Sequence, residues 1–225
     1  MKALFVSVFS VLVLLWLFGC GGDDTPTLEN GGKTVKTIET GISDDGITYF
    51  NKEYGFRICN LPTSGCSVCT RRYKDELEET VLLIAFTADD KWTFEETKLL
   101  DEEVKLESES IPYVTVSVMG SLTWLPSKPD AAKEFMNLVI ELWEIYGIEV
   151  LSRKPVAGVN TTGYEAVVSL PMGDTVWMVK SAFFAKHETG YSIWLWSPED
   201  KYPGMLAYID PMIAGFELLG TYGQQ

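Results

Sequence analysis

The stretch YSIWLW, from Tyr191 to Trp196, decides how this chain is expected to fold. Successive side chains of a strand point to opposite faces, and here large apolar residues fall on both of them. A strand of this kind lies inside a sheet that is covered on each side. We therefore predict a layered fold with Tyr191–Trp196 as a central strand between covering helices.

Other strand-like stretches are found on the N-terminal side of this strand, separated by turn residues such as Met172-Gly173-Asp174 and Glu188-Thr189-Gly190. Their apolar residues alternate or run continuously over lengths typical of strands. The predicted strands are Tyr54–Ile58, Val81–Thr87, Tyr113–Met119, Glu149–Leu151, Ala166–Leu170 and Val176–Ala185. Because they follow one another with few helical stretches between them, they indicate an antiparallel meander.

Two stretches have the spacing of amphipathic helices. The first opens at Pro129-Asp130-Ala131, with a proline and an acid in its first turn, and ends at Gly147. The second is Tyr202–Phe216. The predicted fold class is therefore α+β, with an antiparallel β-sheet flanked by helices on both faces in an α/β/α sandwich.

The N-terminus has the pattern of a bacterial lipoprotein signal, ending in Leu17-Phe18-Gly19-Cys20. The apolar run Ala3–Phe18 would span about 24 Å as a helix, which is short for a bilayer core of about 30 Å and typical of a signal sequence. We predict that residues 1–19 are removed and that Cys20 carries the lipid, palmitate or a similar acyl chain. The alternative is an uncleaved N-terminal helix with an incidental cysteine, and Phe18 is bulkier than the residue usual at that place.

Downstream of Cys20, the predicted organisation is a tether over residues 20–45 and one folded domain over residues 46–225. The tether is rich in Gly, Thr, Asp and Asn, and a coil of this length has an end-to-end distance of roughly 25–30 Å. The expected location is the bacterial membrane, on the periplasmic or outer side. The formal net charge of −14 argues against a nucleic-acid partner and against attachment to anionic lipid head groups.

Three further cysteines, Cys59, Cys66 and Cys69, are the candidates for a structural disulfide, as expected of an exported chain. The Cys66-Ser67-Val68-Cys69 spacing also suits half a zinc site or a thiol-redox pair. We expect the disulfide and predict no metal or cofactor. The lone histidine, His187, is expected in a solvated turn, and the acidic stretch 89–109 lacks the spacing of a calcium loop.

Several short motifs resemble the PsbP-like family of domains. They are Tyr49–Phe56 (YFNKEYGF), Leu61-Pro62, Ala157-Gly158, Tyr191-Ser192-Ile193 and Phe216–Leu219. The resemblance covers roughly residues 47–219 and implies the antiparallel sheet between helices that the family shares with Mog1-type domains. Two departures are Thr63–Cys66, where members usually carry a tryptophan, and the stretch 89–109, which looks inserted.

The family assists photosystem II in oxygenic organisms, and the resemblance implies a different partner for a lipid-anchored bacterial version. We expect a non-catalytic binding or accessory module, not an enzyme, anchored to the membrane by its N-terminal lipid and directed at a protein partner. The alternative is a cysteine-dependent metal-binding or thiol-redox protein that uses Cys66 and Cys69.

Overall fold

The computed structural model describes residues 40–70, 73–74, 78–87, 105–107, 109–120 and 130–219. The predicted signal, Cys20 and nearly all of the predicted tether lie outside the described residues. Most of the acidic stretch 89–109 lies outside them as well.

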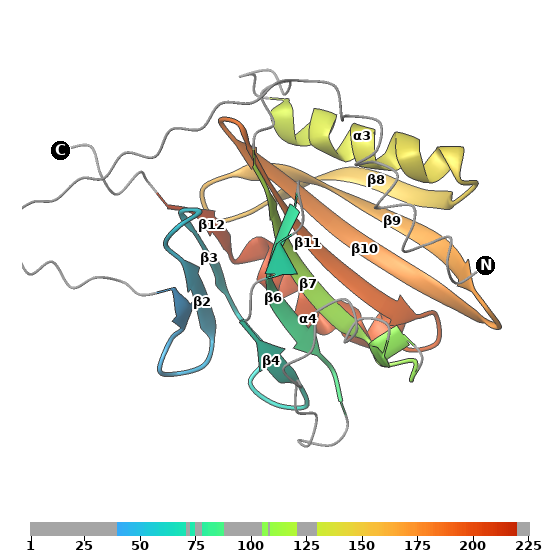
Figure 1. Cartoon of the computed structure of the whole chain (residues 1–225), viewed down its shortest axis with the longest axis horizontal. Helices are drawn as coiled ribbons and strands as arrows, with labels where there is room; N and C mark the ends of the chain where they lie inside the picture. Colours follow the sequence, from blue (N-terminus) through green and yellow to red (C-terminus); the bar gives the residue numbers. More distant parts are fainter. Residues whose placement is uncertain are drawn as a thin grey trace, which may run out of the picture. The chain divides into compact units, whose positions relative to one another are not determined.

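An antiparallel sheet of eight described strands forms the centre of the fold, in the order β4-β6-β7-β11-β10-β9-β8, with β5 also paired to β6 (Figure 1). Its strands are β4 (Ser67–Cys69), β5 (Tyr73–Lys74), β6 (Glu78–Ala85), β7 (Tyr113–Met119), β8 (Glu149–Ala157), β9 (Thr162–Met172), β10 (Thr175–Lys186) and β11 (Thr189–Pro198). Strand β11, which contains the Tyr191–Trp196 stretch, pairs with β7 on one side and β10 on the other. Its predicted central place is confirmed.

Two-residue turns connect β9, β10 and β11 into consecutive hairpins. Gly173-Asp174 joins β9 to β10, and Gly173 has a φ of +65°. His187-Glu188 joins β10 to β11, and His187 has a φ of +54°. Positive φ is typical of the tight turns that match the twist of paired strands. The histidine is exposed in this turn, as the sequence predicted.

Helix α3 (Ala131–Ile145) packs along β8, β9 and β10. Its inward side chains recur at helical spacing and include Phe135, Ile140 and Trp143. The ring of Phe135 contacts that of Phe183 at a centroid distance of 5.3 Å, and Trp143 contacts Trp194 at the same distance. These contacts make one of two cores, which lies between α3 and the large sheet.

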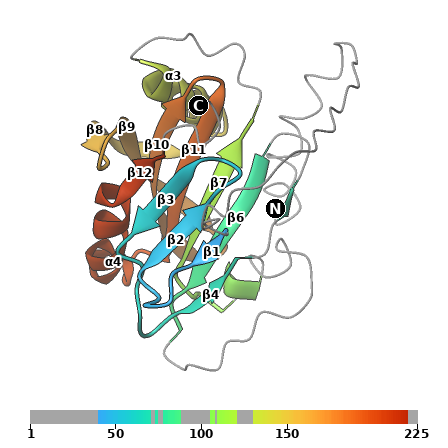
Figure 2. The same cartoon turned by 90° about the vertical axis from the view of Figure 1, so that its left-hand side faces the viewer.

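A second sheet of four described strands was not predicted. It has the order β1-β2-β3-β12 and consists of β1 (Gly41–Ile42), β2 (Thr48–Asn51), β3 (Phe56–Cys59) and β12 (Phe216–Leu218) (Figure 2). Together with helix α4 (Tyr202–Ala214), it encloses the second core against the large sheet. The structure is therefore mostly antiparallel sheet with helices, and the α+β class is confirmed. The predicted covering layer of helix is replaced in large part by this small sheet.

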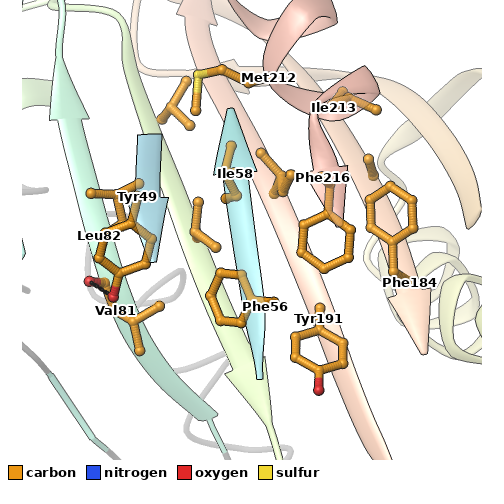
Figure 3. Close-up of a cluster of buried hydrophobic side chains, with 14 of the residues drawn as sticks. Tyr49, Phe56, Ile58, Val81, Leu82, Phe184, Tyr191, Met212, Ile213 and Phe216 are labelled. Carbon is orange, nitrogen blue, oxygen red and sulfur yellow. Dashed lines mark hydrogen bonds between the residues drawn. The ribbon is translucent and has the colours of Figure 1, made fainter. Parts of the chain in front are cut away.

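Aromatic rings fill the second core (Figure 3). Phe216 of β12 lies between Phe56 of β3 and Phe184 of β10, with ring centroids 5.6 and 4.3 Å away. Tyr191 of β11 meets Phe56 edge-on at 5.5 Å. Since Phe56, Phe184 and Phe216 are fully buried, this stack fixes the small sheet on the large one.

The two ends of the small sheet differ from the sequence prediction. Strand β1 begins at Gly41, which lies within the predicted tether 20–45. Helix α4 ends at Ala214, whereas the predicted helix continued through Phe216. A Cβ atom on Gly215 would lie 2.8 Å from the carbonyl oxygen of Cys59, so the chain passes close to β3 before entering β12.

Strand β8 is the last strand of the large sheet on one side. It contains an irregular register between Val150 and Ser152, which is the signature of a β-bulge at Leu151. It also contains Pro155, which has no amide N–H to donate. Both features are typical of an edge strand.

Candidate functional site

The predicted cysteine site does not form. Cys66 and Val68 pack against the second core, whereas Cys69 is buried in the first core, on the other face of the sheet. Side chains three residues apart in a strand point to opposite faces, so the Cys66–Cys69 spacing separates the two thiols here. Cys59 lies on β3 of the small sheet. No disulfide joins these described cysteines, so the structure does not support the predicted disulfide.

The same arrangement removes the basis for a metal or redox centre at this spacing. Cys66 packs against the core on one face of the large sheet and Cys69 in the core on the other, so the two thiols do not face a common site for an ion or for exchange. Among the residues that the structure describes, no group of three or more His, Cys, Asp or Glu side chains is placed to hold a metal ion. His187 projects from its hairpin turn, far in sequence from the cysteines.

Polar residues of the YFNKEYGF motif tie the small sheet to the large one. The Tyr49 hydroxyl donates to the carbonyl oxygen of Val81 at 3.2 Å, and the Asn51 amide donates to Tyr49 at 3.1 Å. The Tyr54 hydroxyl donates to the Glu79 carboxylate at 2.5 Å. The described polar contacts of this motif therefore have a structural role, which is to fix how the two sheets meet.

A similar anchor joins the β8–β9 turn to β12. The side-chain amide of Asn160 donates to the carbonyl oxygen of Leu218 at 2.8 Å, and its oxygen accepts the Leu218 amide at 3.0 Å. The backbone amide of Val159 donates to the carbonyl oxygen of Phe216 at 2.8 Å. The turn thereby continues the hydrogen bonding of the small sheet beyond β12.

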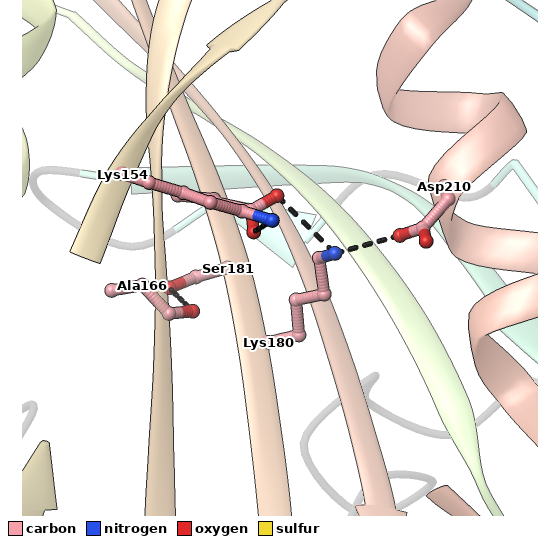
Figure 4. Close-up of polar contacts among 6 residues, drawn as sticks. Lys154, Ala166, Lys180, Ser181 and Asp210 are labelled. Atoms are coloured by element: carbon pink, nitrogen blue, oxygen red, sulfur yellow. Dashed lines mark hydrogen bonds and ion pairs between the residues drawn. The ribbon is translucent and has the colours of Figure 1, made fainter. Parts of the chain in front are cut away.

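The most distinctive polar feature is a charged cluster between α4 and strands β8 to β10 (Figure 4). Its centre is Lys180 of β10, whose ammonium lies 3.2 Å from Glu165 Oε2 and 2.7 Å from Asp210 Oδ1. Lys154 of β8 lies 3.0 Å from Glu165 Oε1. Two ammonium and two carboxylate groups are thus joined in series, and the cluster is neutral in total.

Strand register and helix position explain how these residues meet. Lys154 and Glu165 are directly paired across β8 and β9. Lys180 pairs with Val167, two residues along β9 from Glu165, so its side chain reaches the carboxylate diagonally. Asp210 projects from α4 toward the same face of the sheet.

Burial divides the cluster into an inner and an outer pair. The side chains of Glu165 and Lys180 are 5% and 7% exposed, whereas those of Lys154 and Asp210 are 64% and 54% exposed. Buried charges are tolerated only when they are paired, so the inner two depend on each other. The outer two face solvent and form the accessible surface of the site.

Tyr202, in the first turn of α4, experiences the field of this cluster. Burial, and to a lesser extent the nearby carboxylates of Glu165 and Asp210, raise its pKa to about 12. Tyr202 therefore stays protonated near neutral pH, as a neutral hydroxyl group beside the two acids.

The sequence prediction missed this site. The available signal was one lysine in the apolar run VWMVKSAFFA, which is Val176 to Ala185. A charged residue at an inward position of a strand requires a buried partner. Both partners come from other elements, and the sequence does not identify them.

Of the acidic residues in the stretch 89–109, the structure describes only Glu107 and Glu109. Glu107 accepts a hydrogen bond from the Tyr113 hydroxyl at 3.0 Å. Burial raises the pKa of Glu107, and the hydrogen bond from Tyr113 partly offsets that rise.

In the described part of the chain, no helix has both the length and the apolar character needed to cross a membrane.

No family model matches the sequence, and no curated protein matches it. Among solved structures, the fold is similar to cyanobacterial PsbP (CyanoP) from Synechocystis, with 13% identity, a TM-score of 0.45, and coverage of 83% of this chain and 98% of that one. The fold is also similar to the Ran-binding protein Mog1p of Saccharomyces cerevisiae, with 16% identity and a TM-score of 0.43. That match covers 74% of this chain and 92% of Mog1p.

A third similar structure is LpqN of Mycobacterium tuberculosis, described as involved in cell envelope biogenesis. It is 6% identical, with a TM-score of 0.38, and the match covers 71% of this chain and 87% of that one. The solved structures thus include the PsbP and Mog1 folds that the sequence motifs resembled. This similarity concerns the fold.

Proposed function

We propose that this chain is a membrane-anchored extracytoplasmic lipoprotein whose folded domain binds a protein partner and catalyses no reaction. The observation that carries the binding role is the charged cluster beneath α4. Its inner pair, Glu165 and Lys180, is neutralised within the fold, and its outer pair, Lys154 and Asp210, faces solvent. An accessible pair of charges above a buried one suits recognition of another molecule.

The same observation argues against acid–base catalysis at this cluster. A general acid or base must exchange a proton with a bound substrate, which requires direct contact with it. Lys180 and Glu165 contact each other at 3.2 Å and are nine-tenths buried. Within the fold, Lys180 pairs with Glu165 of the neighbouring strand and also contacts Asp210 of α4.

The anchoring role is supported by the N-terminal sequence, in which Cys20 follows a short apolar run and Gly19. Lipid on Cys20 would place the domain at the membrane surface, and the Gly-rich segment after it would give the domain freedom to reach a partner.

The test of the anchor is substitution of Cys20 by alanine in the full-length chain. Cells are labelled with a clickable palmitate analogue, and the chain is followed by fractionation. We expect the label and the membrane association to be lost. Cys59→Ala is the matched control, because it removes a cysteine of the folded domain and should retain both properties. A Cys20→Ala chain that remains entirely with the membranes would refute the lipid anchor.

A further inference from the structure

Lys154 covers a buried carboxylate without being buried itself. Its ammonium lies 3.0 Å from Glu165 Oε1, yet its side chain is 64% exposed. Ion pairs with so exposed a partner contribute little to stability, so replacing this ammonium by another cation is energetically easy. Glu165 itself requires a cation, since its charge is almost fully buried.

Asp210 offers a second acceptor beside the first. Lys180 donates to Asp210 Oδ1, and about half of the aspartate side chain remains exposed. Glu165 and Asp210 contact the same ammonium, so the two carboxylates lie close enough together for one ligand to reach both. A guanidinium group presents N–H donors on more than one edge in a fixed plane, whereas an ammonium group is a single point of charge.

The helix surface around Asp210 carries no other charge. Asp210 is the only charged residue in the sequence of α4, YPGMLAYIDPMIA. Its neighbours one turn away, Leu206, Ala207 and Ala214, are uncharged, and Tyr208 on the same helix is 39% exposed. A partner that covers this surface would meet Asp210 as the single charge of α4, which an arginine can pair. The net charge of −14 favours the approach of cationic molecules.

We propose that an arginine side chain of a partner protein displaces Lys154 and binds Glu165 and Asp210 where β8 meets α4. In the unbound protein, Lys154 occupies the place of that arginine. The exchange conserves charge, because one cation leaves Glu165 as another arrives, and the inner pair of Glu165 and Lys180 stays intact. This inference rests on the proposed partner-binding function and specifies the chemistry of the partner.

The experiment titrates the full-length chain, purified in a neutral detergent, with N-acetyl-arginine methylamide. Binding is followed by backbone amide NMR shifts. The matched ligand is N-acetyl-citrulline methylamide, which has the same shape without the charge. We expect the arginine compound to shift the amides around Glu165 and Asp210, and the citrulline compound to leave them in place.

Two protein variants sharpen the test. Lys154→Met removes the competing ammonium and keeps the length of the side chain, so it should tighten arginine binding by up to about fivefold, the range of one exposed ion pair. Asp210→Asn should weaken binding while leaving Glu165 paired. Lys133→Met, at an exposed position of α3, is the control and should leave the affinity unchanged.

The inference is wrong if arginine and citrulline compounds bind alike, if the shifts map to another surface, or if Lys154→Met leaves the affinity unchanged. Absence of binding in both the wild-type chain and Lys154→Met also overturns it. None of these outcomes depends on the lipid at Cys20. Failure of this test is therefore distinguishable from failure of the anchoring experiment.

Discussion

Replacing Lys180 by methionine removes the ammonium that joins the two carboxylates under α4. The only ion pair left to Glu165 would be the one with Lys154. The side chain of Lys154 is 64% exposed, whereas that of Glu165 is 5% exposed. Breaking a buried ion pair costs about 3–5 kcal/mol because it leaves an uncompensated charge in the interior. The residual contact with Lys154 favours the lower end. We expect a loss of about 3 kcal/mol in the free energy of unfolding.

The assay is urea unfolding followed by tryptophan fluorescence, with the same m-value required of every variant. Asp210→Asn should lower the free energy of unfolding by at most about 1 kcal/mol. Lys180 remains paired with Glu165 in this variant, and the aspartate is half exposed. The exposed control Lys133→Met should stay within about 0.5 kcal/mol of the wild-type chain.

A double variant, Lys180→Met with Glu165→Gln, gives an internal check. It removes the buried negative charge together with its partner, so it should be more stable than Lys180→Met alone. The reasoning is refuted if Lys180→Met loses no more free energy of unfolding than Lys133→Met. It is also refuted if Asp210→Asn loses as much as Lys180→Met. Either result would mean that the buried pair of Glu165 and Lys180 does not carry most of the electrostatic stabilisation in this cluster.

Three other predictions concern the backbone, the pH dependence and the cysteines. Gly158→Ala should destabilise the fold by about 1–3 kcal/mol in the same urea assay, since its Cβ would lie under 3.0 Å from the carbonyl oxygen of Phe216; Gly204→Ala, with no atom within 4 Å of the new Cβ, should be neutral or stabilising. Burial raises the pKa of Tyr191 from 10.0 to about 12, so the folded state holds its proton longer and stability should fall as the pH rises through that interval. Tyr191→Phe should reduce this slope, and an unchanged slope would contradict the assignment. Titration of the denatured chain with a thiol reagent, without reductant, should find Cys59, Cys66 and Cys69 all reduced. Thiols that react only after a reductant is added would show that a disulfide exists after all.

The sequence was sufficient for the parts of the fold that depend on local patterns. The hairpins from β9 to β11 were predictable because their turn residues and alternating strands are adjacent in the chain. Helix α3 was predictable because its apolar stripe is continuous over several turns. These signals need no information about distant residues.

The small sheet could not be predicted in this way. Phe216 of β12 pairs with Ile58 of β3, and the two residues are far apart in the sequence. Strand β12 has three residues and directly follows α4, so its apolar side chains were assigned to the end of that helix. Only the tertiary contact with β3 distinguishes the two states.

The same limit applies to the charged cluster and the cysteines. A lysine within an apolar strand signals that some acid must meet it, but Glu165 and Asp210 become its partners only through the pairing of β9 with β10 and the docking of α4. Cys66 and Cys69 looked like a pair because their spacing suits a turn or a helix start. Once Ser67–Cys69 is a strand, that spacing separates them.

If lipid on Cys20 holds this protein at a membrane, as we propose, the edge strand β8 has a consequence for its copies within that two-dimensional layer. Molecules confined to a surface meet one another far more often than in dilute solution, and an open strand invites a neighbour to extend the sheet. The irregular step at Leu151 and the missing donor at Pro155 interrupt the template that such a neighbour would need. The β8 edge should therefore not join neighbouring copies into a continuous sheet.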